Sequence, residues 1–318
     1  MRSAHVAVVT LTGTATEIIK NIVLAGVGRL TVIDDDQVVE EDLGAGFFFR
    51  EDDVGSSRTS EAPLARIQEL NPLVKVSGAP RASLDDMKSL AADVLIASGS
   101  RTELIKLNEI CRAHGTKFYA TSEIGAGGYV FSDLGAYDYV VERTVPGKDT
   151  SVMRMHQDFV PLADSLSVKW TESSAVPRFS PGLWGLWALW EYLADGPKSD
   201  LKLDTYTADL EKTALRLLSE KGVSERLVFG RRSVERGPYF VCVLLLTSEL
   251  ANATIAIARG EHAGGFSPVA AVLGGIVAQD ILNALGHREE PIVNWCILDA
   301  ARGTAQVHSV GPGAPTTA

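Results

Sequence analysis

Short apolar segments alternate with amphipathic ones through the first 121 residues. The apolar runs predicted as strands are 4–9, 29–34, 73–76, 94–97 and 117–121, and the stretches with helical spacing are 14–25, 59–70 and 101–114. Alternating strands and helices indicate a parallel sheet with helices on both faces. The sequence therefore predicts an α/β fold with a doubly wound, mostly parallel, Rossmann-like sheet.

The pattern changes beyond residue 143. Residues 129–141 favour extended structure, and between 144 and 237 the periodicity weakens while prolines and charges become frequent. The sheet pattern then returns with two apolar helices, 241–257 and 268–285, and two strands, 293–298 and 304–308. The predicted organisation is a first part of the fold at 1–143, an inserted helical region at 144–237, a C-terminal part of the fold at 238–310 and a disordered tail at 311–318.

Two local patterns predict packing. A helix beginning at Ser180-Pro181 carries Trp184, Trp187 and Trp190, whose spacing keeps the three indoles on one side. Core packing is the preferred interpretation, and a protein interface is the alternative, because tryptophan is favoured at buried contacts. The pair Gly274-Gly275 inside a predicted helix would cost about 1 kcal/mol per glycine relative to alanine, so we expect a neighbouring element to approach closely there.

The connection between the first strand and the first helix lies where a doubly wound fold cradles a phosphate. Of its residues only Gly13 is glycine, whereas Thr10, Thr12 and Ala15 carry Cβ atoms that narrow the approach of a phosphate to the backbone. Asp34 follows 21 residues after Gly13, at the distance where an acidic side chain accepts hydrogen bonds from a ribose. The architecture of a nucleotide site without its glycines predicts a pseudo-enzyme subunit.

Charge and hydropathy limit the partners. The chain is 46% hydrophobic, and its net charge of −10 argues against non-specific binding to nucleic acid or to an anionic membrane surface. No apolar run is expected to reach the roughly 20 residues of a membrane span, and the first strand follows Met1-Arg2-Ser3 directly. We therefore expect a protein or small-molecule partner and a location in the cytosol or nucleus.

The three cysteines, Cys111, Cys242 and Cys296, all lie in apolar surroundings. They are predicted to be buried reduced thiols, since free cysteine is among the most buried residue types. No C-x-x-C pair is present, which excludes a structural zinc site of the paired-cysteine type. No cysteine occurs in the inserted region 144–237.

Several segments together resemble the ThiF-type adenylation fold of the enzymes that activate ubiquitin-like proteins. The matching segments are 17–28, 30–38, 41–48, 54–58, 100–111, 117–119, 125–134 and 267–280. Within that family the chain is most similar to the smaller, non-cysteine subunits of heterodimers that activate SUMO. The resemblance implies an obligate, cysteine-bearing catalytic partner that holds ATP, magnesium and zinc, access to SUMO through the complex, and a location in the nucleus and also the cytoplasm.

Departures from the family pattern are informative. An active adenylation site in this family has a G-x-x-G-x-G loop, an arginine before Gln-Phe and an aspartate after the fourth strand. Here the loop reads Thr10, Gly13 and Ala15, Ala45 takes the place of the arginine, and Gly99 lies near the place of the aspartate. The resemblance thus implies a catalytically inactive subunit with no catalytic, cofactor-binding or metal-binding residue of its own.

Two family positions are kept, and other functions remain open. Asp34 and Arg58 stand at family positions, where we expect them to be structural remnants. Non-cysteine subunits usually begin with a helix whose arginine reaches the partner's ATP, whereas Arg2 is the only basic residue before the first strand. We therefore expect either an upstream start or impaired adenylation. The alternatives are the non-cysteine subunit for another ubiquitin-like modifier and a stand-alone dinucleotide-binding oxidoreductase.

Overall fold

Eight strands form one sheet in the computed structural model, in the order β10-β9-β6-β5-β4-β1-β2-β3. The model describes residues 1–143, 151–170, 179–194, 196, 203–224, 265–300 and 302–311. The strands of this sheet are β1 (His5–Val9), β2 (Arg29–Ile33), β3 (Lys75–Ala79), β4 (Val94–Ala97), β5 (Lys117–Ile124), β6 (Gly127–Asp133), β9 (Trp295–Asp299) and β10 (Thr304–His308). The pairs from β3 to β5 are parallel, and β5-β6, β6-β9 and β9-β10 are antiparallel. The predicted mostly parallel α/β sheet is confirmed.

Helices cover both faces of the sheet. They are α1 (Gly13–Leu24), α2 (Glu61–Leu70), α3 (Met87–Leu90), α4 (Arg101–His114), α5 (Leu162–Ser167), α6 (Pro181–Tyr192), α7 (Leu203–Glu220) and α12 (Ser267–Gly286), with short 3-10 turns η1 (Glu40–Gly44), η2 (Glu51–Asp53) and η3 (Arg81–Asp86). Alternation along β1 sends Val6 and Val8 into the core shared with α1 and α12, and Ala7 and Val9 into the core shared with α4 and α6. The predicted strand at 73–76 is two residues too early, because Val74 donates its N–H to the carbonyl of Asn71 in a turn before β3 begins.

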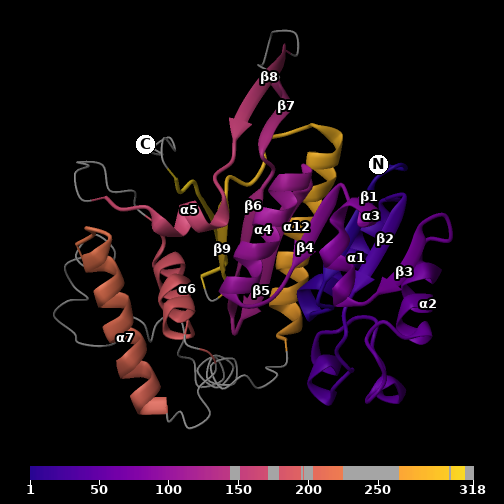
Figure 1. Ribbon diagram of the computed structural model, residues 1–318, viewed down its shortest axis with the longest axis horizontal. Helices are drawn as coiled ribbons and strands as arrows, with labels where there is room; N and C mark the ends of the chain where they lie inside the picture. The colour runs from indigo at the N-terminus through magenta and orange to yellow at the C-terminus, as the bar shows by residue number, and fades with distance from the viewer. Residues whose placement is uncertain are drawn as a thin grey trace.

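The region predicted as an insertion contributes to the core on the face of the sheet that α4 covers. The strand β7 (Ala136–Arg143) pairs antiparallel with β8 (Ser151–Asp158), so a hairpin spans the predicted boundary at 143 and projects from the body of the molecule (Figure 1). Both α5 and α6 contribute buried side chains to the core beneath the sheet. The division at 144–237 and 238–310 stays a prediction. The predicted helix 241–257 and the tail 312–318 lie outside the described residues.

The tryptophans of α6 pack in the core. Trp184, Trp187 and Trp190 are buried, and the rings of Trp187 and Trp190 lie 6.0 and 5.8 Å from that of Trp295 on β9. Aromatic pairs at such distances add stability beyond the burial of their area. The preferred interpretation of this tryptophan stripe as core is confirmed.

The two glycines inside α12 have opposite surroundings. A Cβ added at Gly274 would lie 3.1 Å from backbone atoms of Glu17 and Ile18 in α1, whereas one added at Gly275 would meet no atom within 4 Å. The predicted close approach is therefore confirmed for Gly274 and wrong for Gly275, because only one side of α12 faces α1.

This difference predicts opposite effects of the same substitution. Gly274→Ala should lower the free energy of unfolding by about 1–3 kcal/mol, since the helices must move apart. Gly275→Ala should raise it by up to about 1 kcal/mol, because alanine has the higher helix propensity and nothing blocks its methyl group. Urea unfolding of the two variants checks this, and equal midpoints for both would contradict the packing.

The length and composition of helix α12 differ from the expectation that no apolar run reaches the length of a membrane span. Its residues Ser267–Gly286 are long and apolar enough to cross a membrane, so the expectation that no run would qualify is wrong. Half of its apolar stretch is buried inside the protein, where Val277 and Ile281 belong to the core shared with α1. A buried core helix passes the same test, so this feature is weak evidence for a span.

A buried carboxyl group on α12 predicts a pH effect. Asp280 accepts hydrogen bonds from the Tyr119 hydroxyl at 2.7 Å and from the Ile292 N–H at 2.9 Å, and burial raises its pKa to about 6. Between roughly pH 4 and 6 the folded protein therefore binds a proton that the unfolded chain has lost, so this group's contribution to stability falls as the pH rises.

Asp280→Asn removes that titration. We expect the unfolding free energy of the variant minus that of the wild type to increase by about 2–3 kcal/mol between pH 4 and 7, because one pKa unit corresponds to about 1.4 kcal/mol. The altered hydrogen bonds of the asparagine amide shift this difference in unfolding free energy by the same amount at every pH. Chemical unfolding of both proteins across this range is the measurement, and a difference independent of pH would refute the expectation.

Candidate functional site

The loop between β1 and α1 keeps an unusual backbone shape. Thr10 has φ of +68°, in the left-handed region that is a genuine outlier for a β-branched residue. Two residues later Thr12 caps α1, its Oγ1 accepting a hydrogen bond from the Ala15 N–H at 3.2 Å. The loop thus has, at Thr10, a backbone conformation that suits glycine.

An ion pair from two other segments lies against this loop. Arg81, at the start of η3, donates from Nη2 to the Thr10 Oγ1 at 2.5 Å, and its other terminal nitrogen pairs with Glu103 of α4. The carboxylate of Glu103 also occupies the space beside Gly99, where an added Cβ would lie 2.5 Å from Oε2. The position near the family aspartate is therefore covered by a glutamate from the following helix.

A second carboxylate lies at the other end of the loop. Glu123, near the end of β5, accepts a hydrogen bond from the Thr14 hydroxyl in the first turn of α1. Its Oε1 would lie 2.9 Å from a Cβ at Gly13, and the Ala45 methyl group would lie 2.7 Å from it. Glycine at this position is thus required by packing against the chain's own side chains.

Asp34 and Arg58, the two residues expected at family positions, belong to a buried network. Asp34 accepts hydrogen bonds from the N–H groups of Leu11 at 2.7 Å and Asp36 at 2.9 Å. The Arg58 guanidinium is also buried, donates to Asp42 at 2.9 Å and has Nη1 3.5 Å from Asp34. By accepting from two backbone N–H groups, the Asp34 carboxylate stabilises the local shape of the loop. The interpretation of Asp34 and Arg58 as structural remnants stays a prediction.

The residues around the loop do not fit a triphosphate. The Glu103 and Glu123 carboxylates lie at its two ends, and the Arg81 guanidinium is already paired with Glu103. Phosphate sites need backbone N–H groups or free guanidinium forks facing the anion. Here phosphate charge would meet negative side chains, so the geometry disfavours a nucleotide in this loop.

The described cysteines and the possible metal ligands also give no sign of a reactive centre. Burial raises the pKa of Cys111 to about 12 and that of Cys296 to about 11, so both are neutral thiols and poor nucleophiles near pH 7. Cys242 lies outside the described residues. Within the described part of the chain no group of three or more His, Cys, Asp or Glu side chains is placed to hold a metal ion.

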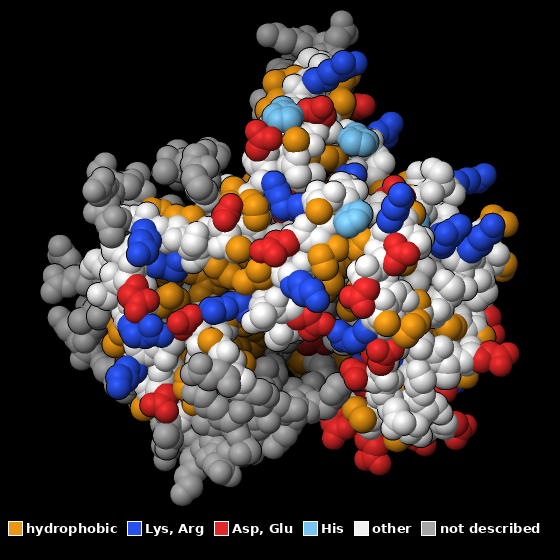
Figure 2. All heavy atoms as spheres, viewed as in Figure 1, with side chains coloured by type: hydrophobic (Ala, Val, Ile, Leu, Met, Phe, Trp, Pro, Cys, Tyr) orange, Lys and Arg blue, Asp and Glu red, His pale blue; other side chains and the backbone are white. Residues whose placement is uncertain are grey.

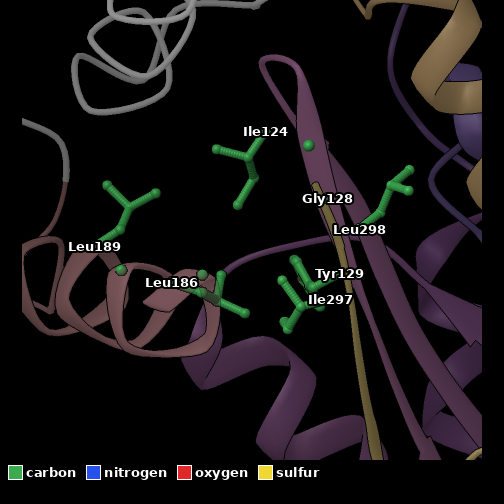
Figure 3. A pocket seen from close by; sticks show the side chains of 10 residues that line it. Ile124, Gly128, Tyr129, Leu186, Leu189, Ile297 and Leu298 are labelled. Atoms are coloured by element: carbon green, nitrogen blue, oxygen red, sulfur yellow. The ribbon is translucent and has the colours of Figure 1, made fainter. Parts of the chain in front are cut away.

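One apolar pocket lies between α6 and the strands β5, β6 and β9 (Figure 3). Its volume is about 50 Å³, and it is lined by Ile124, Gly127, Gly128, Tyr129, Gly182, Gly185, Leu186, Leu189, Ile297 and Leu298. This pocket lacks charged lining residues and is too small for a nucleotide. No sequence motif predicts this pocket or the contacts of Arg81, Glu103 and Glu123, because the partners of these residues lie far away along the chain.

Comparisons with known proteins identify the family. The model of the ThiF family matches residues 1–315. SUMO-activating enzyme subunit 1 of Rattus norvegicus is 30% identical over 98% of this chain and 89% of that protein, and that of Homo sapiens is 30% identical over 98% and 90%.

Solved structures support the fold. Two crystal structures of E. coli MccB, one with MccA-N7isoASN and one with AMPCPP and MccA, superpose with TM-scores of 0.52 and 0.53 at 15% and 14% identity. They cover 99% and 100% of this chain and 67% of the MccB chain in each case. The likeness to MccB concerns the fold alone, but the family match extends over nearly the whole sequence, and the chain belongs to the ThiF family.

Proposed function

We propose that this chain is the regulatory, catalytically inactive subunit of a heterodimeric SUMO-activating enzyme. The observation that carries the proposal is its similarity to SUMO-activating enzyme subunit 1 over 98% of this chain and about nine tenths of the relative. A match over nearly the whole of both chains favours a shared role in an assembly over a shared fold alone. The chain's task is then to form the heterodimer and support the partner's active site.

In this proposal the chemistry belongs to the partner. A cysteine-bearing subunit holds ATP, magnesium and zinc, the complex adenylates the C-terminal glycine of SUMO, and the partner's thiolate then displaces AMP to form a thioester. Two observations support this division of labour. The carboxylates of Glu103 and Glu123 lie at the nucleotide loop of this chain, and the thiols of Cys111 and Cys296 are buried.

The proposed subunit works without nucleic acid or a membrane, in the nucleus and also the cytoplasm. Figure 2 shows acidic side chains gathered at the lower right, and the exposed acidic residues of η1 and η2 are Glu40, Glu41, Glu51 and Asp52. A surface of this sign repels phosphate backbones and anionic lipid headgroups. The acidic net charge therefore supports a protein partner.

Reconstitution tests the proposal. The chain is mixed with a cysteine-bearing SUMO-activating subunit, the complex is sized by chromatography with light scattering, and ATP and SUMO are added. We expect a 1:1 complex and a reducible SUMO adduct on the partner, unchanged when Cys111 and Cys296 are replaced by serine. An adduct on this chain, or no complex at all, would overturn the proposal. Replacing SUMO with another ubiquitin-like modifier shows whether the alternative subunit role holds instead.

A further inference from the structure

Glu123 lies where the N-terminal ends of two long helices meet. Its carboxylate accepts a hydrogen bond from Thr14, the second residue of α1. On the other side, a Cβ at Gly265, two residues before α12 begins, would lie 2.5 Å from the same carboxylate. The glycines at 13 and 265 leave room for this side chain between the two helix ends.

Both helices begin without an acidic residue of their own. Neither the first turn of α1 nor that of α12 contains Asp or Glu. The first turn of a helix has unpaired N–H groups and a positive end of the helix dipole, and a negative charge placed there is stabilising. Glu123 brings that charge from β5, which is far from both helices in the sequence.

We infer that Glu123 is an internal counter-anion, occupying the place that a phosphate takes at the start of such a helix. It stabilises the joined ends of α1 and α12, whose bodies pack together where Gly274 faces Glu17. Glu123 also prevents other anions from binding at the loop. A second negative group would clash with its side chain and be repelled by its charge. This role of Glu123 is independent of the proposed function.

Thermal unfolding of the full chain tests the first part of the inference. Glu123→Gln keeps an oxygen that accepts from Thr14 but removes the charge. We expect its midpoint to fall by about 1–3 °C, the shift for losing one charge that faces the starts of two helices in a protein of this size. The matched control is Glu109→Gln on the exposed side of α4, which should leave the midpoint unchanged. Equal midpoints for Glu123→Gln and the wild type would overturn the counter-anion.

Inorganic pyrophosphate tests whether Glu123 closes the loop. We expect it to raise the midpoint of Glu123→Ala in a saturable manner, whereas the wild type and Glu109→Ala should respond only as they do to sodium chloride of equal ionic strength. A saturable response of the wild type, or none of Glu123→Ala, would overturn the closure. If Glu123→Ala does not fold, Glu123→Ser takes its place in the titration, because it likewise removes the charge and most of the volume. No partner subunit is present, so the result does not depend on the proposed function.

Discussion

The isolated chain is expected to catalyse no ATP–pyrophosphate exchange. Where the family pattern is expected to have loop glycines, an arginine for the phosphate charge and an aspartate for magnesium, this chain has Thr10 and Ala15, Ala45 and Gly99. Removing even one charge-stabilising group of an active site commonly lowers the rate by a factor of about 10² to 10³. Losses of several such groups should put exchange below detection.

Radioactive exchange with and without the partner measures this. When a cysteine-bearing SUMO-activating subunit is added, exchange should appear and should require the modifier. The partner alone is the control that assigns the activity to the complex. Exchange by this chain alone, at a rate comparable to that of the mixture, would show that the loop binds ATP productively and that the pseudo-enzyme interpretation is wrong.

Trp295→Ala is expected to lower the free energy of unfolding by about 3–5 kcal/mol, the usual cost of emptying a buried tryptophan site. Trp295 lies on β9 with none of its surface exposed, and its indole N–H donates to the Ser165 hydroxyl at 3.3 Å. Its ring contacts Phe131 from the neighbouring strand and Trp187 from α6. The cavity therefore forms where the sheet, α5 and α6 meet.

Urea unfolding followed by far-ultraviolet circular dichroism gives the size of this loss. Val307→Ala on the neighbouring strand β10 is the control, because Val307 is 50% exposed and its truncation should change stability by less than about 0.5 kcal/mol. A loss below 1 kcal/mol for Trp295→Ala would mean that α6 does not pack on the sheet as described.

Local sequence signals were sufficient for individual elements. Helix α4 has the predicted limits, since the Ser100 hydroxyl accepts from the Glu103 N–H at its start and Gly115 adopts φ of +71° at its end. Cap and stop residues act within a few positions, so they can be read without knowing the fold. The same holds for the buried strands, whose apolar runs are required on a sheet covered on both faces.

The candidate site was only half predictable. Departures from the expected nucleotide-site pattern, such as Thr10 in the loop and Ala45 after η1, can be read from the sequence because such a site requires specific residue types. The side chains that fill the loop are not visible. Arg81 donates to Thr10 and pairs with Glu103 because the carboxyl ends of the parallel strands β1, β3 and β4 lie at the same end of the sheet, and this contact depends on the strand order.

The sequence by itself determined the alternation of strands and helices, the missing glycines and the absence of paired cysteines, since these follow from residue types and short spacings. Only the tertiary structure decided that Gly274 touches α1 while Gly275 faces open space, and that Glu123 meets the starts of α1 and α12. The physical reason is the distance along the chain over which each interaction acts. Propensity and capping act over a few residues, whereas packing and charge contacts depend on which distant segments the sheet brings together.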